Sequence, residues 1–153
     1  MRKYKGSLGV AITGGLGEEV TPWAGASVLV ELYRKAGVQA AVERALPQKK
    51  SPKGLTQGQM VESFVLLGAL GGDCIEDMER LRADGGLKSI LGYQAPAAET
   101  ARQWLDRFHD DSVMAPGLFQ RAFVPDESAP LAGLREALRQ VVWTYVDKVK
   151  LQP

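Results

Sequence analysis

The stretch GGDCIEDMERLRADGGLKSILGYQAPAAETARQWLDRF, residues 71–108, decides the fold that the sequence predicts. Asp73 and Glu76 have the spacing of a capping box, which satisfies free amides at the start of a helix. Gly92 stops a second short helix and Pro96 opens a third. The apolar stripe of that third helix is Ala97, Ala101, Trp104, Leu105 and Phe108. We therefore predict short helices joined by tight turns, an arrangement that can include a helix-turn-helix.

Helical patterns continue on both sides of this stretch. Pro22 can begin a helix, and a second one ends before Pro47. Thr56 and Gln59 form another capping-box pattern, and the helix that follows, to residue 70, is apolar on nearly every side, as expected for a helix at the centre of a core. The last helix, after Pro130, has a long apolar seam: Leu131, Leu134, Leu138, Val141, Val142, Tyr145 and Val149.

The front of the chain has a different pattern. Residues 8–12 form a short apolar run, and glycines at 14, 15 and 17 separate it from residues 18–21. Glycine supplies the backbone freedom of tight turns, so we predict a small β-hairpin here. The chain is thus expected to be one mostly α domain, residues 1–153, with several helices and a short N-terminal β-hairpin.

Composition excludes several classes of protein. Hydrophobic residues make up 45% and charged residues 24%, which is ordinary for a globular domain. The apolar run between Glu62 and Asp73 is too short to span a bilayer. The single cysteine, Cys74, rules out an internal disulfide and fits a reducing compartment, so we expect a cytoplasmic location.

The residues do not predict an active site. Asp73, Glu76, Asp77 and Glu79 are dense acids, but acids at a helix start are typical of capping and of the helix dipole. His109 is the sole histidine, so no histidine-based metal cluster is expected. The glycines near residue 15 match neither a Walker motif nor a dinucleotide fingerprint. We expect no enzyme activity, cofactor, metal or small-molecule substrate.

Positive charge and one helix face suggest DNA. Residues 1–53 contain nine Lys/Arg against four acids, whereas the remainder is acidic. The polar side of the 96–108 helix carries Thr100, Arg102, Gln103 and Arg107. Arginine pairs with guanine and glutamine with adenine in the major groove, although the same residues also describe any solvated helix face.

A run of short motifs resembles a known family. The run is Gly-Gly-Asp at 71–73, Glu-Asp at 76–77, Leu81-Arg82 with Asp84, Leu91-Gly92, then Thr100, Arg102, Trp104 and Leu105. It resembles the N-terminal region of DDE-type transposases of bacterial insertion sequences (the DDE transposase group-one family). Val20-Thr21 and the segment that follows resemble the family's strand-to-helix entry. In that family a ribonuclease-H-like catalytic domain comes after a helix like the last one here, so none of its catalytic acids can be assigned to this chain.

The resemblance implies a role in DNA transposition without catalysis. We expect a truncated product or excised domain that binds the terminal inverted repeats of an insertion sequence as double-stranded DNA. Thr100, Arg102 and Gln103 would face the bases, and Arg107 with Lys49, Lys50 and Lys53 would contact phosphates. The alternative is a helical dimerisation or structural module that packs on the catalytic domain or on a second subunit of a homodimer.

Overall fold

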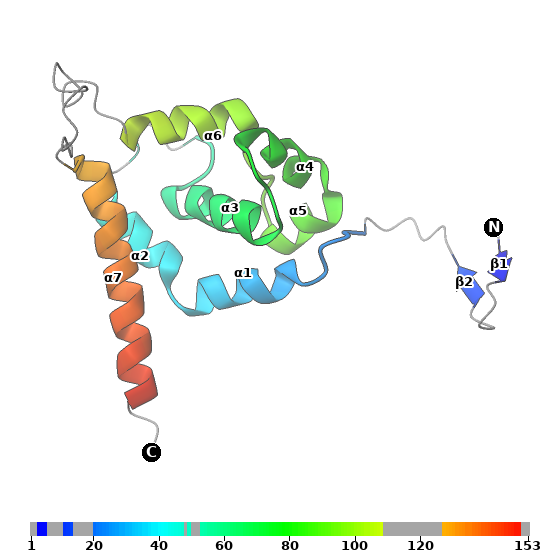
Figure 1. Ribbon diagram of the computed structural model, residues 1–153, viewed down its shortest axis with the longest axis horizontal. Coiled ribbons are helices and arrows are strands. Elements are labelled where there is room, and N and C mark those ends of the chain that lie inside the picture. The colour runs from blue at the N-terminus through cyan, green and yellow to red at the C-terminus, as the bar shows by residue number, and fades with distance from the viewer. Residues whose placement is uncertain are drawn as a thin grey trace, which may run out of the picture.

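The computed structural model describes residues 3–5, 11–13, 20–47, 49, 53–108 and 127–150, with side chains for all of these except 3–5, 11–13 and 148–150. The fold is mostly α, as the sequence predicted (Figure 1). The longer helices are α1 (Ala26–Lys35), α2 (Val38–Ala45), α3 (Gln57–Ala69) and α7 (Ala129–Lys150). The shorter elements are η1 (Ile75–Asp77), α4 (Met78–Ala83), α5 (Gly85–Leu91), α6 (Ala98–Leu105) and η2 (Asp106–Phe108).

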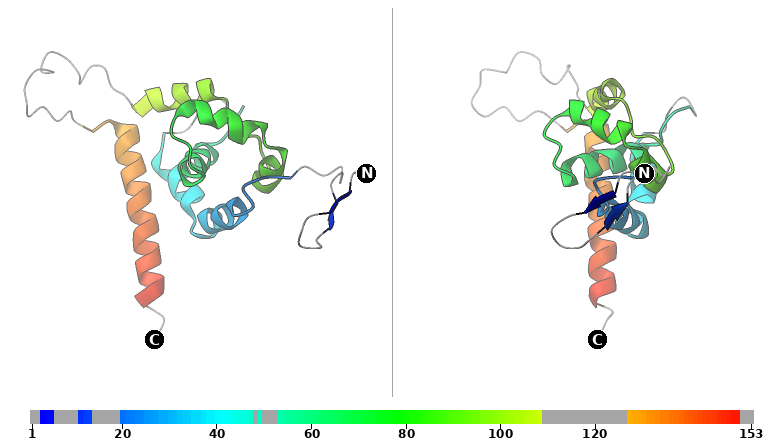
Figure 2. Two further views of the ribbon diagram at one scale, coloured as in Figure 1. Left: turned by 45° about the vertical axis from the view of Figure 1, so that its right-hand side comes forward. Right: turned by 90° about the vertical axis from the view of Figure 1, so that its right-hand side faces the viewer.

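Helix α3 lies at the centre of the helical body, with the other helices arranged around it (Figures 1 and 2). The predicted capping box starts it: the Gln59 amide donates to the Thr56 hydroxyl (3.2 Å), and the Thr56 amide donates to the Gln59 side chain (2.9 Å). Such a cap contributes about 1 kcal/mol. The apolar surface of α3 then divides the core into two clusters, which share contacts with Phe64.

The two clusters hold different helices against α3. One buries side chains of α1, α4 and α5 against it: Ala26, Val30, Leu66, Leu67, Met78, Leu81, Leu87 and Leu91. The other joins α2, α6 and α7: Ala41, Val42, Leu46, Met60, Trp104 and Ala137. Helix α7 approaches α2 closely at Gly133, where an added Cβ would lie 2.4 Å from the Ala45 carbonyl oxygen. The C-terminal end of α7 extends past α1 and α2 (Figures 1 and 2).

The second predicted capping box is wrong in its residues. The carboxylate of Asp77, not Glu76, accepts from the Asp73 amide (3.0 Å) and the Cys74 amide (3.4 Å). The N-cap is Cys74 in extended conformation, so the first helical residue is Ile75. The acid three residues after Cys74 therefore faces the free amides, and the predicted box lies one residue too early.

The predicted hairpin pairing is not seen either. The two short strands are β1 (Lys3–Lys5) and β2 (Ala11–Thr13), which pair antiparallel with Lys3 opposite Thr13. Val20 and Thr21, expected in the second strand, have no strand conformation. Ala11 and Ile12 of the expected first strand lie in β2, and the rest of that prediction, residues 8–10 and 14–19, lies outside the described residues. Within the part of the chain that the structure describes, no helix is long and apolar enough to cross a membrane.

Candidate DNA-facing surface and apolar groove

Helix α6 presents its polar face outward because its apolar face is firmly held. Ala101 and Trp104 are buried, and the Trp104 indole N–H donates to the Gln57 side-chain oxygen at 2.6 Å. The Trp104 ring stacks on Phe64 with centroids 5.5 Å apart and contacts Phe108 at 4.5 Å. The four α6 and η2 residues predicted to face DNA are all exposed: Thr100, Arg102, Gln103 and Arg107.

Two of these exposed side chains are held by acids. The Arg102 guanidinium forms ion pairs with Glu99 (3.1 Å) and with Glu76 of η1. These carboxylates, Glu99 foremost, raise the pKa of Arg102. The Gln103 amide donates to the second Glu99 oxygen at 3.0 Å. To contact a base, the Arg102 guanidinium would therefore have to leave the carboxylates of Glu76 and Glu99 and donate to acceptor atoms of the base instead.

The basic loop before α3 has a structural function at Lys49. The Lys49 ammonium donates to the carbonyl oxygens of Lys53 (2.8 Å) and Leu55 (2.7 Å), which closes the loop around Gly54. An ammonium has three N–H donors, so this arrangement engages two of them. Lys53 is exposed, and Lys50 lies outside the described residues.

Several residues of the family-like motif stabilise the fold. The Asp84 carboxylate caps α5 by accepting from the Leu87 amide (2.7 Å) and also accepts from the Thr21 hydroxyl (2.8 Å). Asp84 thus fastens the entry segment before α1 to the start of α5. An added Cβ at Gly86 would lie 2.7 Å from the Thr21 backbone nitrogen, which shows how closely the two segments approach.

A buried polar cluster was not predicted from the sequence. Glu62, on α3, is 1% exposed, and it accepts from Arg34 Nε (2.9 Å), Arg34 Nη2 (3.2 Å) and the Tyr93 hydroxyl (2.8 Å). Arg34 also donates to the Leu91 carbonyl oxygen at 2.7 Å. Burial raises the pKa of Tyr93 well above its usual value. A glutamate within an otherwise apolar helix was the signal that could have revealed this cluster.

The cluster of Glu62, Arg34 and Tyr93 stabilises the fold. Among the described residues, no buried side-chain nitrogen or oxygen is left without a hydrogen-bond partner. The carboxylate of Glu62 is surrounded by donors, which is what a buried charge needs to be retained in a core. Nor do three or more metal-ligating side chains gather anywhere in the described part of the chain.

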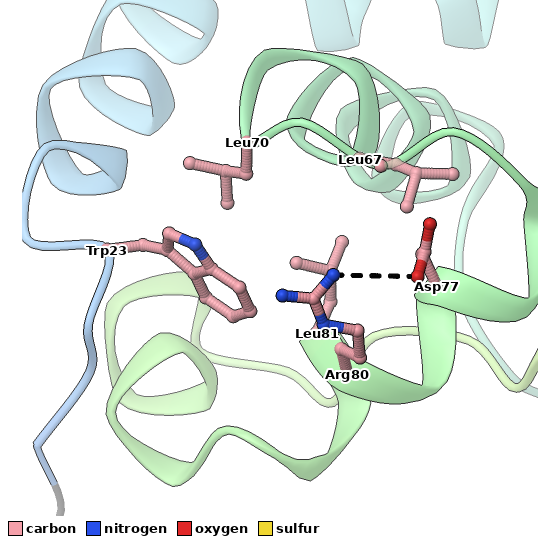
Figure 3. A pocket seen from close by; sticks show the side chains of 7 residues that line it. Trp23, Leu67, Leu70, Asp77, Arg80 and Leu81 are labelled. Atoms are coloured by element: carbon pink, nitrogen blue, oxygen red, sulfur yellow. Dashed lines mark ion pairs between the residues drawn. The ribbon is translucent and has the colours of Figure 1, made fainter.

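A small hollow near Trp23 is too small for a ligand. Figure 3 shows its walls, where the Arg80 guanidinium lies 5.9 Å from the centre of the Trp23 ring and 3.6 Å from Asp77. The other wall residues are Leu67, Leu70, Gly72 and Leu81. Its volume of about 10 Å³ is at most that of a single water molecule. We regard it as packing between the entry segment and α4.

A much larger hollow, of about 420 Å³, lies between α1 and α7. We call it the apolar groove, and its lining residues are Leu29, Leu32, Tyr33, Ala36, Val38, Val42, Val61, Val65, Leu134, Ala137, Leu138 and Val141. The one polar group among them, the Tyr33 hydroxyl, already donates to the Gly58 carbonyl oxygen at 3.0 Å. Small-molecule sites need a few polar groups that fix the orientation of the ligand, so this groove suits apolar side chains better.

Comparison with known proteins gives the chain no family: no family model, no curated protein and no solved structure matches it.

Proposed function

We propose that this chain is the non-catalytic N-terminal region of a DDE-type insertion-sequence transposase, and that it binds double-stranded DNA at the terminal inverted repeats. The motif residues between 71 and 108 support the family, and the outward polar face of α6 supports the binding. A helix-turn-helix built from α5 and α6, and a cytoplasmic location, are parts of this proposal.

Arg102 and Gln103 are adjacent on α6 and exposed, so both can reach base edges in a major groove. Arg107 lies one turn further on, and Lys49, Lys50 and Lys53 lie in the loop before α3. In this proposal these four cations contact phosphates, which position a protein on the duplex, while Thr100, Arg102 and Gln103 face the bases. Cleavage of the DNA belongs to a catalytic domain outside this chain.

The test is a gel-shift titration of the full chain against terminal-repeat duplexes and scrambled duplexes, over a salt series. Arg102→Ala and Gln103→Ala should weaken binding to the terminal repeat more than to the scrambled duplex. Lys49→Ala, Lys53→Ala and Arg107→Ala each remove one cation that contacts a phosphate, so each should lower the salt slope by about 0.9. Lys35→Ala, on α1, is a matched control for loss of an exposed cation. Absence of binding at low salt would reject the proposal.

The apolar groove favours a second candidate function, a structural module that packs on another subunit or on the catalytic domain. Large apolar side chains are exposed in its walls or beside it on several helices: Leu32, Val65, Leu138, Val142 and Tyr145. A contiguous apolar surface of this kind is typical of a protein–protein contact. The two candidates are compatible, because DNA would contact α6 whereas the groove lies between α1 and α7.

A further inference from the structure

We infer that the apolar groove is filled by a second copy of this chain, through reciprocal contacts of the two α7 helices. This inference rests on the second candidate function above, and it names the partner of that surface. It is independent of whether α6 binds DNA.

Most of the described side chains in the C-terminal half of α7, up to Asp147, are exposed. Residues 141–146 read VVWTYV, six successive residues without a charge, which make an uncharged band around more than one helical turn. Val141 packs against the cluster that joins α2, α6 and α7, but Val142, Trp143 and Tyr145 are 50%, 54% and 69% exposed. A helix that is apolar on all sides is normally buried on all sides.

We call Val142 and Tyr145 the ridge, and they lie on the same side of α7 as the groove. Leu134, Ala137 and Leu138 of α7 form one wall of the groove, and Val142 and Tyr145 follow Leu138 by four and seven residues, the spacing of a single helix face. Trp143 lies on the other side of the helix and is not part of the ridge. A surface that holds both a hollow and a matching ridge can pair with itself about a two-fold axis. Antiparallel α7 helices would place the ridge of each copy in the groove of the other.

The size of the exposed surface fits a dimer. At about 100 Å² on average for each exposed side chain, Leu32, Val65, Leu138, Val142 and Tyr145 offer on the order of 500 Å² per chain, before the buried walls of the groove are counted, against the roughly 800 Å² that one partner contributes to a standard interface. Tyrosine is also one of the side chains that most often dominate such contacts. With a formal net charge of +1, two copies do not repel each other strongly.

Sedimentation equilibrium of the full chain at several concentrations tests the inference. We expect a monomer–dimer equilibrium, and Leu138→Glu and Tyr145→Glu should each weaken it by about tenfold or more, because a charge would enter an apolar contact. Both residues are exposed, so helix content should be retained, and so should the unfolding midpoint at concentrations where the unchanged chain is monomeric. Val28→Glu is the matched control, because Val28 is a 67% exposed apolar residue of α1 outside the groove.

Cross-linking then tests the arrangement. In a Cys74→Ser background, Leu32→Cys and Tyr145→Cys chains should form a mixed disulfide with each other in preference to pairs of either variant alone. A chain that stays monomeric, a dimer insensitive to both glutamate variants, or cross-links in which each variant prefers itself would overturn the inference. A monomer that still shifts terminal-repeat DNA would reject the dimer and leave the DNA-binding proposal intact. A dimer that binds no terminal-repeat DNA would support the dimer and reject the DNA-binding proposal.

Discussion

Arg34 and Glu62 form a two-point ion pair that joins α1 to α3, with the carboxylate buried and the guanidinium 40% exposed. Arg34 extends this link to a third segment by donating to the Leu91 carbonyl oxygen at the end of α5. The Arg34 side chain therefore connects α1, α3 and the end of α5.

Loss of Arg34 should destabilise the protein strongly. Arg34→Ala leaves a buried carboxylate without its cation, and removal of one partner of such a pair costs about 3 kcal/mol or more of unfolding free energy. Lys35→Ala is the matched control, because Lys35 pairs with Glu31 on the exposed side of the same helix and should change little. Urea unfolding followed by circular dichroism measures both variants. Similar losses in the two would contradict a special role for Arg34.

Loss of Asp84 should destabilise the contact between the entry segment before α1 and the start of α5. Asp84→Ala removes the cap of α5 and the acceptor of the Thr21 hydroxyl, so we expect a loss of about 2 kcal/mol. Thr21→Val removes the bond to Asp84 and also the acceptor of the Trp23 amide (3.1 Å), so it should cost about as much. In a double-mutant cycle the two changes should be less than additive, because they share one hydrogen bond. Strict additivity would mean that the Thr21–Asp84 bond contributes nothing in solution.

The sequence was a good guide where the interactions are local. The capping box at Thr56 and the long last helix each depend on residues within a few positions of one another, and both were found. The apolar stripe of α6 was found in part, because Ala101 and Trp104 are buried whereas Leu105 is 37% exposed. The capping box at Asp73 failed because the helix begins one residue later, with Cys74 as its N-cap, so that Asp77 accepts from the free amides. Spacing alone does not contain that information.

The sequence was a poor guide where distant segments meet. Glu62 is 28 residues from Arg34 and 31 from Tyr93, so no local pattern could pair them. The apolar groove likewise depends on how α7 lies against α1 and α2. For the residues proposed to face DNA, helical periodicity correctly gave the exposed face of α6, but it could not show that Arg102 is held by Glu76 of another element.

Alkaline pH should destabilise the fold through its buried tyrosines. Burial raises the pKa of Tyr33 and of Tyr93 above the ordinary value of 10.0, with nearby Glu62 acting in the same direction. Above pH 10 the unfolded chain loses these protons while the folded chain keeps them, so stability is present below that pH and falls as pH rises above it. Unfolding measured at increasing pH should show this fall.

Replacing one of these tyrosines should reduce the alkaline fall. Tyr33→Phe removes one of the two hydroxyls that resist ionisation, at the cost of its bond to the Gly58 carbonyl oxygen. Tyr145→Phe, which removes an exposed hydroxyl on α7, is the control. An unchanged pH dependence in Tyr33→Phe would show that Tyr33 ionises as easily in the folded protein as in the unfolded chain.

The acids around Arg102 should restrain DNA binding. Glu76→Gln removes one carboxylate partner of Arg102 and one negative charge beside the exposed face of α6. We expect the affinity for terminal-repeat duplexes to rise by roughly threefold to tenfold at low salt, and the gain to shrink as salt screens the charges. Glu136→Gln makes the same charge change on α7, where Glu136 pairs with Arg139, and should give a smaller gain. The double variant Glu76→Gln/Arg102→Ala separates the two possible causes. If the gain comes from releasing Arg102 to contact a base, it should vanish in the double variant, whereas a gain that persists would mean that the lost negative charge alone is responsible.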